Sequence, residues 1–381
     1  MRKIYLPILT LGVFLVTVVR QNPSELFESK EHYFMLEEIT NELEFPWGMD
    51  FLPNGDILIT EKYSGNLRVI RNDKLDEAAI AGLPSNIYSG GQGGLLDVLV
   101  HPNFVQNHYI FLSYSGTGDG GNGTEVIRAE FDGQRLRKVK KIFTAWPKTN
   151  GSHHFGSRLA IAKDQTLFIT LGDRYHKMHE AQNPSNHFGS VIRINIDGSV
   201  PKDNPFIELE NHREEIYSYG HRNGQGIAVR SSDGTIWMHE HGPRGGDELN
   251  ILQKPGANYG WPAITYGIDY SGAIISNKKT AVGMEQPVAY WVPSIAPCGM
   301  AFYDGPAFAK WEGDLFVGAL AGQHLRRIRL KGNKLVEQEV LLKDYARIRD
   351  VASGPEGFIY LLTDSNEGKL VRLKPVANLD G

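Results

Sequence analysis

A pattern of short apolar strands and turns recurs six times along the chain, and it limits the fold more than any other feature of the sequence. In each copy an apolar strand leads into a turn of Pro, Asn, Asp or Gly, and a second apolar strand follows. A polar loop then leads to a third strand, which is often basic. The copies begin about 45 to 75 residues apart and cover residues 48–70, 95–115, 158–173, 226–242, 299–320 and 350–364.

This pattern predicts an all-β protein, a six-bladed β-propeller with four-stranded antiparallel blades over residues 32–375. The alternatives are a pair of β-sandwiches or a β-helix, but the spacing is too irregular for a solenoid and the copies are too many for one sandwich. No segment shows a sustained helical period, so we expect few helices. Residues 32–40 look like a strand, which could complete the last blade and close the ring.

Four stretches between the copies lack a strand pattern, and we interpret them as loop insertions. Long loops of this kind are usually functional, and in a propeller they gather at the mouths of the central channel. The stretches are residues 116–124, 175–187, 201–215 and 258–290.

The N-terminal residues 1–20 combine a basic start, Arg2 and Lys3, with an apolar run over 4–19. This is typical of a secretory signal, although the run is slightly long for one and slightly short for a membrane span. A cleaved signal peptide and a retained N-terminal membrane anchor both remain open, with a core element as a third interpretation. We expect an exported protein, periplasmic or extracellular, with or without the anchor.

Charge and cysteine content narrow the function further. The net charge of −4 is well mixed along the chain, which gives no electrostatic footprint for nucleic acid. The single cysteine, Cys298, excludes a disulfide within the chain, and no cysteine follows the apolar run to carry a lipid.

Three polar segments lie where strands are expected to emerge into loops: 152–159, 220–226 and 345–351. They belong to different copies, so only closure of a ring would bring them together. Arg347 and Arg349 are two residues apart and share one face of a strand, so they could clamp carboxylates or phosphates. The alternative is a pair of solvated surface charges.

His154 and Arg222 could act as a general base beside an electrostatic stabiliser. His153 precedes His154, so either histidine could point inward. Asn223 and Gln225 lie in the same loop as Arg222 and offer amide donors and acceptors.

The turn at Gly242 and Pro243 exposes backbone carbonyls, and Tyr259 and Asp269 follow downstream. Carbonyl and carboxylate oxygens are the ligands that calcium prefers. His239 and His241 form an H-x-H pair on one face, but no third zinc ligand follows at a suggestive spacing.

At this point the sequence resembles a known family, the soluble pyrroloquinoline-quinone (PQQ)-dependent sugar dehydrogenases of the glucose/sorbosone or aldose sugar dehydrogenase group. The resemblance covers the chain from about residue 40 to 375. It implies PQQ and calcium as cofactors, and oxidation of an aldose sugar at the C1 hydroxyl to the lactone. The matching segments are residues 91–104, 154–173, 218–229, 241–250, 258–262 and 347–351.

The resemblance also implies roles for single residues. His154 matches the general base that removes the proton of the C1 hydroxyl, and Arg222 matches the arginine that polarises the quinone. The residues implied at the cofactor, or near the substrate beside it, are Gln92, Asp173, Arg222, Asn223, Gln225, His241, Ser294, Arg347 and Arg349. The residues implied at calcium ions are Gly242, Pro243, Tyr259 and Asp269.

The sequence departs from the family pattern at three positions. Ala321 replaces a lysine that the family often uses at the cofactor, His153 replaces an acidic residue beside the base, and His241 replaces a glutamine. A calcium-dependent propeller lactonase or other hydrolase, and a non-catalytic carbohydrate- or protein-binding propeller, remain alternatives. The arginine pair favours the dehydrogenase, because a lactonase has no need of two clamped carboxylates. The sequence assigns no natural sugar, electron acceptor or oligomeric state.

Overall fold

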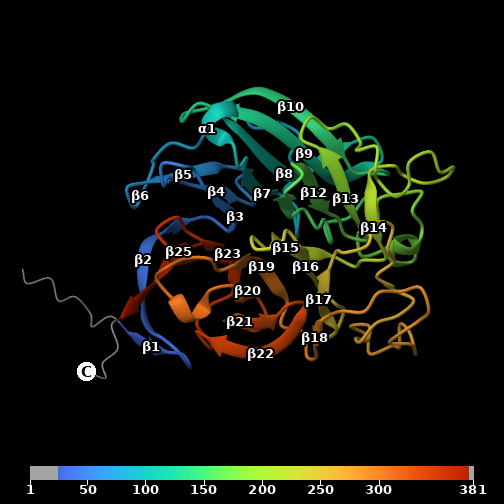
Figure 1. Cartoon of the computed structure of the whole chain (residues 1–381). Coiled ribbons are helices and arrows are strands. Elements are labelled where there is room, and N and C mark those ends of the chain that lie inside the picture. Colours follow the sequence, from blue (N-terminus) through green and yellow to red (C-terminus); the bar gives the residue numbers. More distant parts are fainter. Residues whose placement is uncertain (1–24, 377–381) are drawn as a thin grey trace, which may run out of the picture.

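The computed structural model describes residues 25–376, which form six small antiparallel sheets arranged as blades around a central axis (Figure 1). Five sheets have four strands and one has five. The helical elements of the described residues are short: α1 (Phe104–Asn107) and two 3-10 turns, Met178–Gln182 and Ala309–Trp311. The predicted six-bladed, nearly all-β propeller is confirmed.

The first three blades follow one another in chain order, each built outward from an inner strand. The first consists of β3 (Pro46–Phe51), β4 (Ile57–Glu61), β5 (Leu67–Arg71) and β6 (Lys74–Leu75). The second consists of β7 (Leu95–Val100), β8 (Tyr109–Gly118), β9 (Gly121–Phe131) and β10 (Leu136–Thr144). The third consists of β11 (Leu159–Ile161), β12 (Thr166–Thr170), β13 (Ser190–Asn195) and β14 (Ile216–Tyr219).

The last three blades complete the ring. The fourth consists of β15 (Gly224–Val229), β16 (Ile236–Glu240), β17 (Asp247–Ile251) and β18 (Ala289–Trp291). The fifth consists of β19 (Pro297–Phe302), β20 (Leu315–Ala319), β21 (His324–Lys331) and β22 (Lys334–Leu341). The sixth consists, from the axis outward, of β23 (Ile348–Ser353), β24 (Ile359–Thr363), β25 (Gly368–Val376), β2 (Tyr33–Leu43) and β1 (Leu26–Glu28).

The N-terminal strand β2 closes the ring by pairing antiparallel with the C-terminal strand β25 (Figure 1). The register runs from Tyr33 opposite Val376 to Leu43 opposite Gly368. The predicted closing strand at residues 32–40 is therefore confirmed. The short strand β1 was not predicted, and it adds a fifth strand to this blade by pairing with β2.

The second strand of most blades is buried along its whole length, because neighbouring blades pack against both of its faces. This is why these strands read as unbroken apolar runs in the sequence, rather than as strict alternation of apolar and polar residues. Residues 167–171 of the third blade are an example. The strands with every residue buried are β4, β12, β16, β20 and β24.

One predicted insertion is wrong. Residues 116–124 form the tip of the β8–β9 hairpin, with Gly118 opposite Gly121, because glycines at the turn let two long strands continue past the blade. The other three predicted insertions are loops that contain no strand, apart from the last residues of 258–290, which enter β18.

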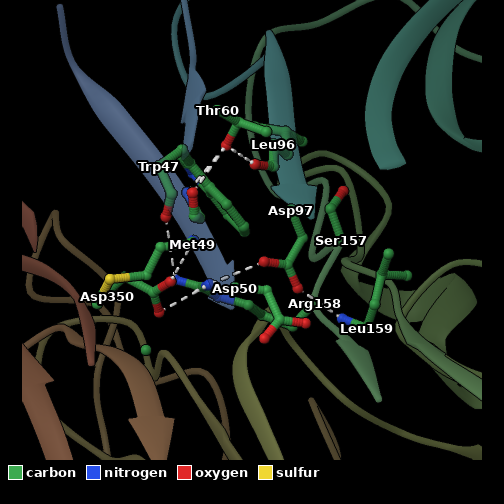
Figure 2. A network of polar contacts seen from close by, with 12 residues as sticks. Trp47, Met49, Asp50, Thr60, Leu96, Asp97, Ser157, Arg158, Leu159 and Asp350 are labelled. Carbon is green, nitrogen blue, oxygen red and sulfur yellow. Dashed lines mark hydrogen bonds and ion pairs between the residues drawn. The ribbon is translucent and has the colours of Figure 1, made fainter. Parts of the chain in front are cut away.

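A buried arginine, Arg158, lies on the axis and contacts each of the other five blades; Figure 2 shows part of this network. Its Nη1 lies 3.1 Å from Asp97 Oδ1 and 2.9 Å from Asp350 Oδ1. Its guanidinium also packs 4.1 Å from the centroid of the Trp47 ring. The remaining partners of its N–H groups are the carbonyls of Trp47, Gln225 and Arg349 and the thiol of Cys298.

Burial raises the pKa of the carboxyl groups near this arginine. Burial raises the pKa of Asp97 to about 7, although the charge of Arg158 opposes the rise. Burial likewise raises the pKa of Asp50 to about 7, against backbone N–H donors from Val100 and Phe51. Arg158 therefore lies among carboxyl groups whose charged form is disfavoured by burial.

The predicted signal or anchor at residues 1–20 lies outside the described residues. Within residues 25–376, no helix has the length and apolar character needed to cross a membrane.

We expect Arg158→Met to lower the free energy of unfolding by about 3–5 kcal/mol, because it removes one partner of a buried ion pair and leaves Asp97 and Asp350 unpaired. Chemical denaturation of the purified protein measures the loss. The matched control is Arg137→Met, which breaks an exposed pair with Asp132 and should cost far less, because solvent screens that pair. Equal losses in the two variants would contradict the role given to Arg158.

Candidate active site

A cavity of about 360 Å³ opens where the inner strands begin, and all six blades contribute to its wall. It brings together the three predicted polar segments, represented by Gly156, by Gln225 and by Arg347 with Arg349. Ring closure therefore has the predicted effect. The lining residues are Phe45, Trp47, Lys62, Tyr63, Gly91, Gln92, Phe155, Gly156, Gln225, His241, Ala296, Leu320, Arg347, Arg349 and Asp364.

His154 and Asp173 form a buried pair behind the cavity wall, where His154 precedes the lining residue Phe155 and its backbone N–H donates to the lining residue Gln92. His154 Nδ1 lies 2.5 Å from Asp173 Oδ1, and Trp261 Nε1 donates to Asp173 Oδ2 at 2.8 Å. A carboxylate can only accept hydrogen bonds, so Nδ1 carries the proton and Nε2 keeps its lone pair. Nothing in residues 25–376 makes a hydrogen bond to Nε2, so this nitrogen can accept a proton from a ligand.

The surroundings keep the imidazole neutral. Burial lowers the pKa of His154, and the hydrogen bond to Asp173 only partly offsets that effect, while the nearby charge of Arg222 adds to it. Burial alone would raise the pKa of Asp173, but its hydrogen bond with His154 and the charge of Arg222 hold that pKa below the usual value. At neutral pH the pair is a neutral histidine beside a carboxylate, as a general base requires.

Two loops fix the backbone of the base. The backbone N–H of His154 donates to Gln92 Oε1 at 2.7 Å, and Gln92 N donates to the carbonyl of Ser152 at 2.7 Å. His154 itself has a φ of 52°, in the left-handed region that non-glycine residues seldom adopt. Gly91, with a φ of 58°, passes so close that a Cβ there would lie 2.7 Å from Ser152. The strain at His154 is thus held by its neighbours.

Arg222 lies beside the predicted carbonyl turn. Its Nη1 donates to the carbonyl of Gly242 at 2.7 Å and to that of His241 at 3.1 Å. Asp247 fastens the same turn, because it accepts from Gly242 N at 2.9 Å and from the Ser294 hydroxyl at 2.8 Å. Within the described residues, the carbonyl of Pro243 accepts no hydrogen bond.

The side-chain amides of Asn223 and Gln225 differ in how many of their hydrogen-bonding groups have a partner. Asn223 Oδ1 accepts from Gly156 N at 3.0 Å, and Gln225 Nε2 donates to the carbonyl of Gly156 at 3.2 Å. The Nδ2 of Asn223 is buried without a partner. Because a buried donor without an acceptor is costly, Asn223 offers a hydrogen bond to a ligand.

The predicted arginine clamp faces the cavity. Arg349 Nη2 and Arg347 Nη2 both lie 2.9 Å from the carboxylate of Asp364, and only 9% of the Arg349 side chain is exposed. Burial would raise the pKa of Asp364, but the charges of Arg349 and Lys62 hold it at about 2. The cavity therefore has more positive than negative charge, which suits an anionic ligand. The alternative of a solvated surface pair is wrong for Arg349.

Three predicted site residues face away from the cavity or bind within the protein. The Ser294 hydroxyl donates to Asp247, the Tyr259 ring stacks on His221 with centroids 4.5 Å apart, and the exposed Asp269 carboxylate accepts from Ser271. Their predicted contacts with cofactor or calcium stay predictions.

The structure gives the H-x-H pair internal partners. His241 Nε2 lies 2.8 Å from the carbonyl of Pro297, and His239 Nε2 lies 3.3 Å from that of Gly299. In the part of the chain that the structure describes, no three His, Cys, Asp or Glu side chains are placed to hold a metal ion. The pair therefore offers no support for a zinc site.

Sequence reasoning missed several residues that hold the site together. Asp247 and Trp261 lie in segments that resemble the family. The sequence therefore marked these segments, but it did not show which residues Asp247 and Trp261 contact. Asp364 lies far from the arginines in sequence, and only strand pairing within the sixth blade brings it to them. Lys62 was missed because it directly follows an ordinary apolar strand, β4, and nothing local marks it as part of a site.

Comparisons with known proteins point to one family. Residues 43–372 match the family described as Glucose / Sorbosone dehydrogenase. The chain is 40% identical over 346 residues to the aldose sugar dehydrogenase YliI of Escherichia coli, which covers 89% of this chain and 92% of that protein.

Solved structures give the same result. A glucose dehydrogenase superposes with a TM-score of 0.86 at 45% identity, over 89% of this chain and 99% of that one. The PQQ-bound form of the aldose sugar dehydrogenase from Streptomyces coelicolor superposes with a TM-score of 0.74 at 25% identity, over 90% of this chain and 98% of that one. The chain therefore belongs to the glucose/sorbosone dehydrogenase family of sugar-oxidising enzymes.

Proposed function

We propose that this protein is a PQQ- and calcium-dependent aldose dehydrogenase, which oxidises the C1 hydroxyl of an aldose to the lactone. The observation that carries the proposal is the placement of the His154–Asp173 base behind the wall of a cavity that Arg347 and Arg349 make cationic. A sugar hydroxyl needs the base, and a polycarboxylate cofactor needs the cations. The PQQ-bound form of a family member with the same fold supports the choice of cofactor.

The residues of the cavity fit PQQ, which is a small planar quinone with three carboxylates. The volume of about 360 Å³ lies within the usual range for small-molecule sites. Arg347 and Arg349 would hold carboxylates, and the unpaired Nδ2 of Asn223 would donate a hydrogen bond. An apolar cavity would accept none of these groups.

The carbonyl turn fits calcium, which binds oxygen ligands. The Gly242 carbonyl already binds Arg222 but keeps a second lone pair, and the Pro243 carbonyl is unpaired within the described residues. We propose these two oxygens as calcium ligands beside the cofactor. A further calcium at Tyr259 and Asp269 is proposed from the sequence alone.

The mechanism follows from the protonation state of the base. The Nδ1–H of His154 donates to Asp173, so Nε2 accepts the proton of the C1 hydroxyl. Arg222, held by the Gly242 carbonyl, stabilises the negative charge that develops in the site. The chemistry that bound PQQ supplies is acceptance of the hydride from C1. Loss of this hydride and of the hydroxyl proton turns the aldose into its lactone.

We also propose that the enzyme works outside the cytoplasm, in the periplasm or at the outer face of the membrane. The basic and apolar start of the sequence supports export. Calcium is plentiful outside the cytoplasm, which suits the proposed cofactor. An external electron acceptor would then reoxidise the cofactor, because oxidation of the sugar leaves the quinone reduced.

Adding PQQ and calcium to the purified protein should change the absorption spectrum of the quinone and start aldose-dependent reduction of a dye. Leaving calcium out should weaken both, because the carbonyl turn would then lack its cation. The lactone is identified in the products. Absence of both the spectral change and dye reduction would refute the proposal, and hydrolysis of a lactone without PQQ would favour a lactonase.

His154→Ala should keep the spectral change on PQQ binding but lower turnover by about 10²–10⁴-fold, the usual contribution of a general base. The readouts are a quinone titration and steady-state dye reduction. His179→Ala, which removes an exposed histidine from the neighbouring 175–187 loop, is the matched control and should keep both quinone binding and turnover. Loss of quinone binding in His154→Ala would show that this residue holds the cofactor instead.

The pH profile tests the pair directly. Because burial lowers the pKa of His154, turnover should be independent of pH above about 6.5, the usual histidine value, and fall only on further acidification. The Asp173 hydrogen bond raises that pKa, so Asp173→Asn should shift the acid limb to still lower pH, as well as slowing turnover. Asp132→Asn, at an exposed site, should leave the profile unchanged. An acid limb that moves upward in Asp173→Asn would contradict the assignment.

A further inference from the structure

Lys62 is the least expected residue in the cavity wall. It follows β4 and is only 6% exposed, and it lines the cavity together with Arg347, Arg349 and Asp364. Its Nζ lies 4.1 Å from the centroid of the Tyr63 ring and 5.7 Å from that of the Phe45 ring. The two rings pack edge to face at 4.9 Å, so they form a preformed aromatic corner around the ammonium group.

This ammonium group has no ionic partner. No carboxylate in residues 25–376 lies within ion-pair distance of Lys62 Nζ, and no hydrogen bond from it is found there. Lysines are almost never buried to this extent unless they are paired, since removing a charge from water is costly. The aromatic faces recover only part of that cost.

The acid in the cavity wall, Asp364, already pairs with other cations. Asp364 accepts from Arg347 and binds Arg349, so a single carboxylate serves two guanidinium groups. Lys62 acts on it only through its charge. The wall thus contains three cations and one anion, and Lys62 is the cation that forms no ion pair within the described residues.

We propose that Lys62 is the third cation of the anion clamp, and that its ammonium group binds a carboxylate of the cofactor directly. The proposal rests on the proposed function, and it adds a ligand that comes from the first blade rather than from the sixth. It also accounts for the departure at Ala321, which follows the lining residue Leu320 and brings no charge. A different blade, the first, would supply the cation instead.

The test is a titration of the purified protein with PQQ in the presence of calcium, followed by the absorption spectrum of the quinone rather than by turnover. Lys62→Met keeps the length and apolar stem of the side chain but removes the charge. We expect its Kd for PQQ to rise by about tenfold to a hundredfold, the scale for losing a charged hydrogen bond. A Kd within twofold of wild type would overturn the proposal.

Two controls separate this proposal from the proposed function. Lys369→Met removes an exposed lysine that pairs with Glu38, so it makes the same change in net charge away from the cavity and should leave the Kd unchanged. Arg347→Met, whose side chain is 48% exposed, should weaken binding. If Arg347→Met weakens binding and Lys62→Met does not, only the role of Lys62 fails. If wild type does not bind PQQ, or neither variant affects binding, the cavity is not the cofactor site.

Thermal unfolding excludes a purely structural role. Because Lys62 forms no ion pair or hydrogen bond within the described residues, its charge adds no stability without ligand, so Lys62→Met should have a Tm equal to or higher than that of wild type. The rise in Tm on adding PQQ should be smaller in the variant, in line with its weaker binding. A ligand-free Tm that falls by several degrees would show that Lys62 holds the fold, and would overturn the proposal.

Discussion

The ring depends on the guanidinium of Arg158, which lies on the axis and contacts all five other blades. Blades of a propeller otherwise pack only against their neighbours, so nothing in blade packing alone fixes all six inner strands at once. A planar group with five N–H donors can do this. The carboxylates of Asp97 and Asp350 compensate its charge. Because all three side chains are buried, loss of either the arginine or the carboxylates would leave an uncompensated buried charge.

This network also sets where a ligand can bind. Arg158 lies between the cavity at the start of the inner strands and a second cavity of about 290 Å³ at the ends of the same strands. Asp50, Asp97 and Asp350 line this second cavity. Arg349 belongs to both regions, because its carbonyl accepts from Arg158 while its side chain reaches Asp364 in the cationic cavity. The position of the anion clamp is therefore coupled to the axial network.

The sequence predicted the parts of the fold that repeat and the parts of the site that lie in motifs. The strand-and-turn copies, the closing strand and the meeting of the three polar segments, at Gly156, Gln225 and Arg349, all follow from local patterns plus ring closure. It could not predict the β8–β9 hairpin tip, because glycines suit loops and long hairpins equally. It also missed Lys62 and Asp364, since a charge at the end of a strand has no meaning until the strand beside it is known.

The two charged regions along the axis deal with surplus charge in different ways. Around Arg158 the surplus is acidic, and a carboxyl group such as Asp97, whose pKa is about 7, can discharge it by binding a proton. In the cavity the surplus is basic, and arginines keep their charge at physiological pH. Binding a proton cannot relieve a positive surplus, so the charge of the two arginines calls for an anion. The network on the axis is thus compensated within the protein, whereas the proposed clamp would be completed by an anionic ligand.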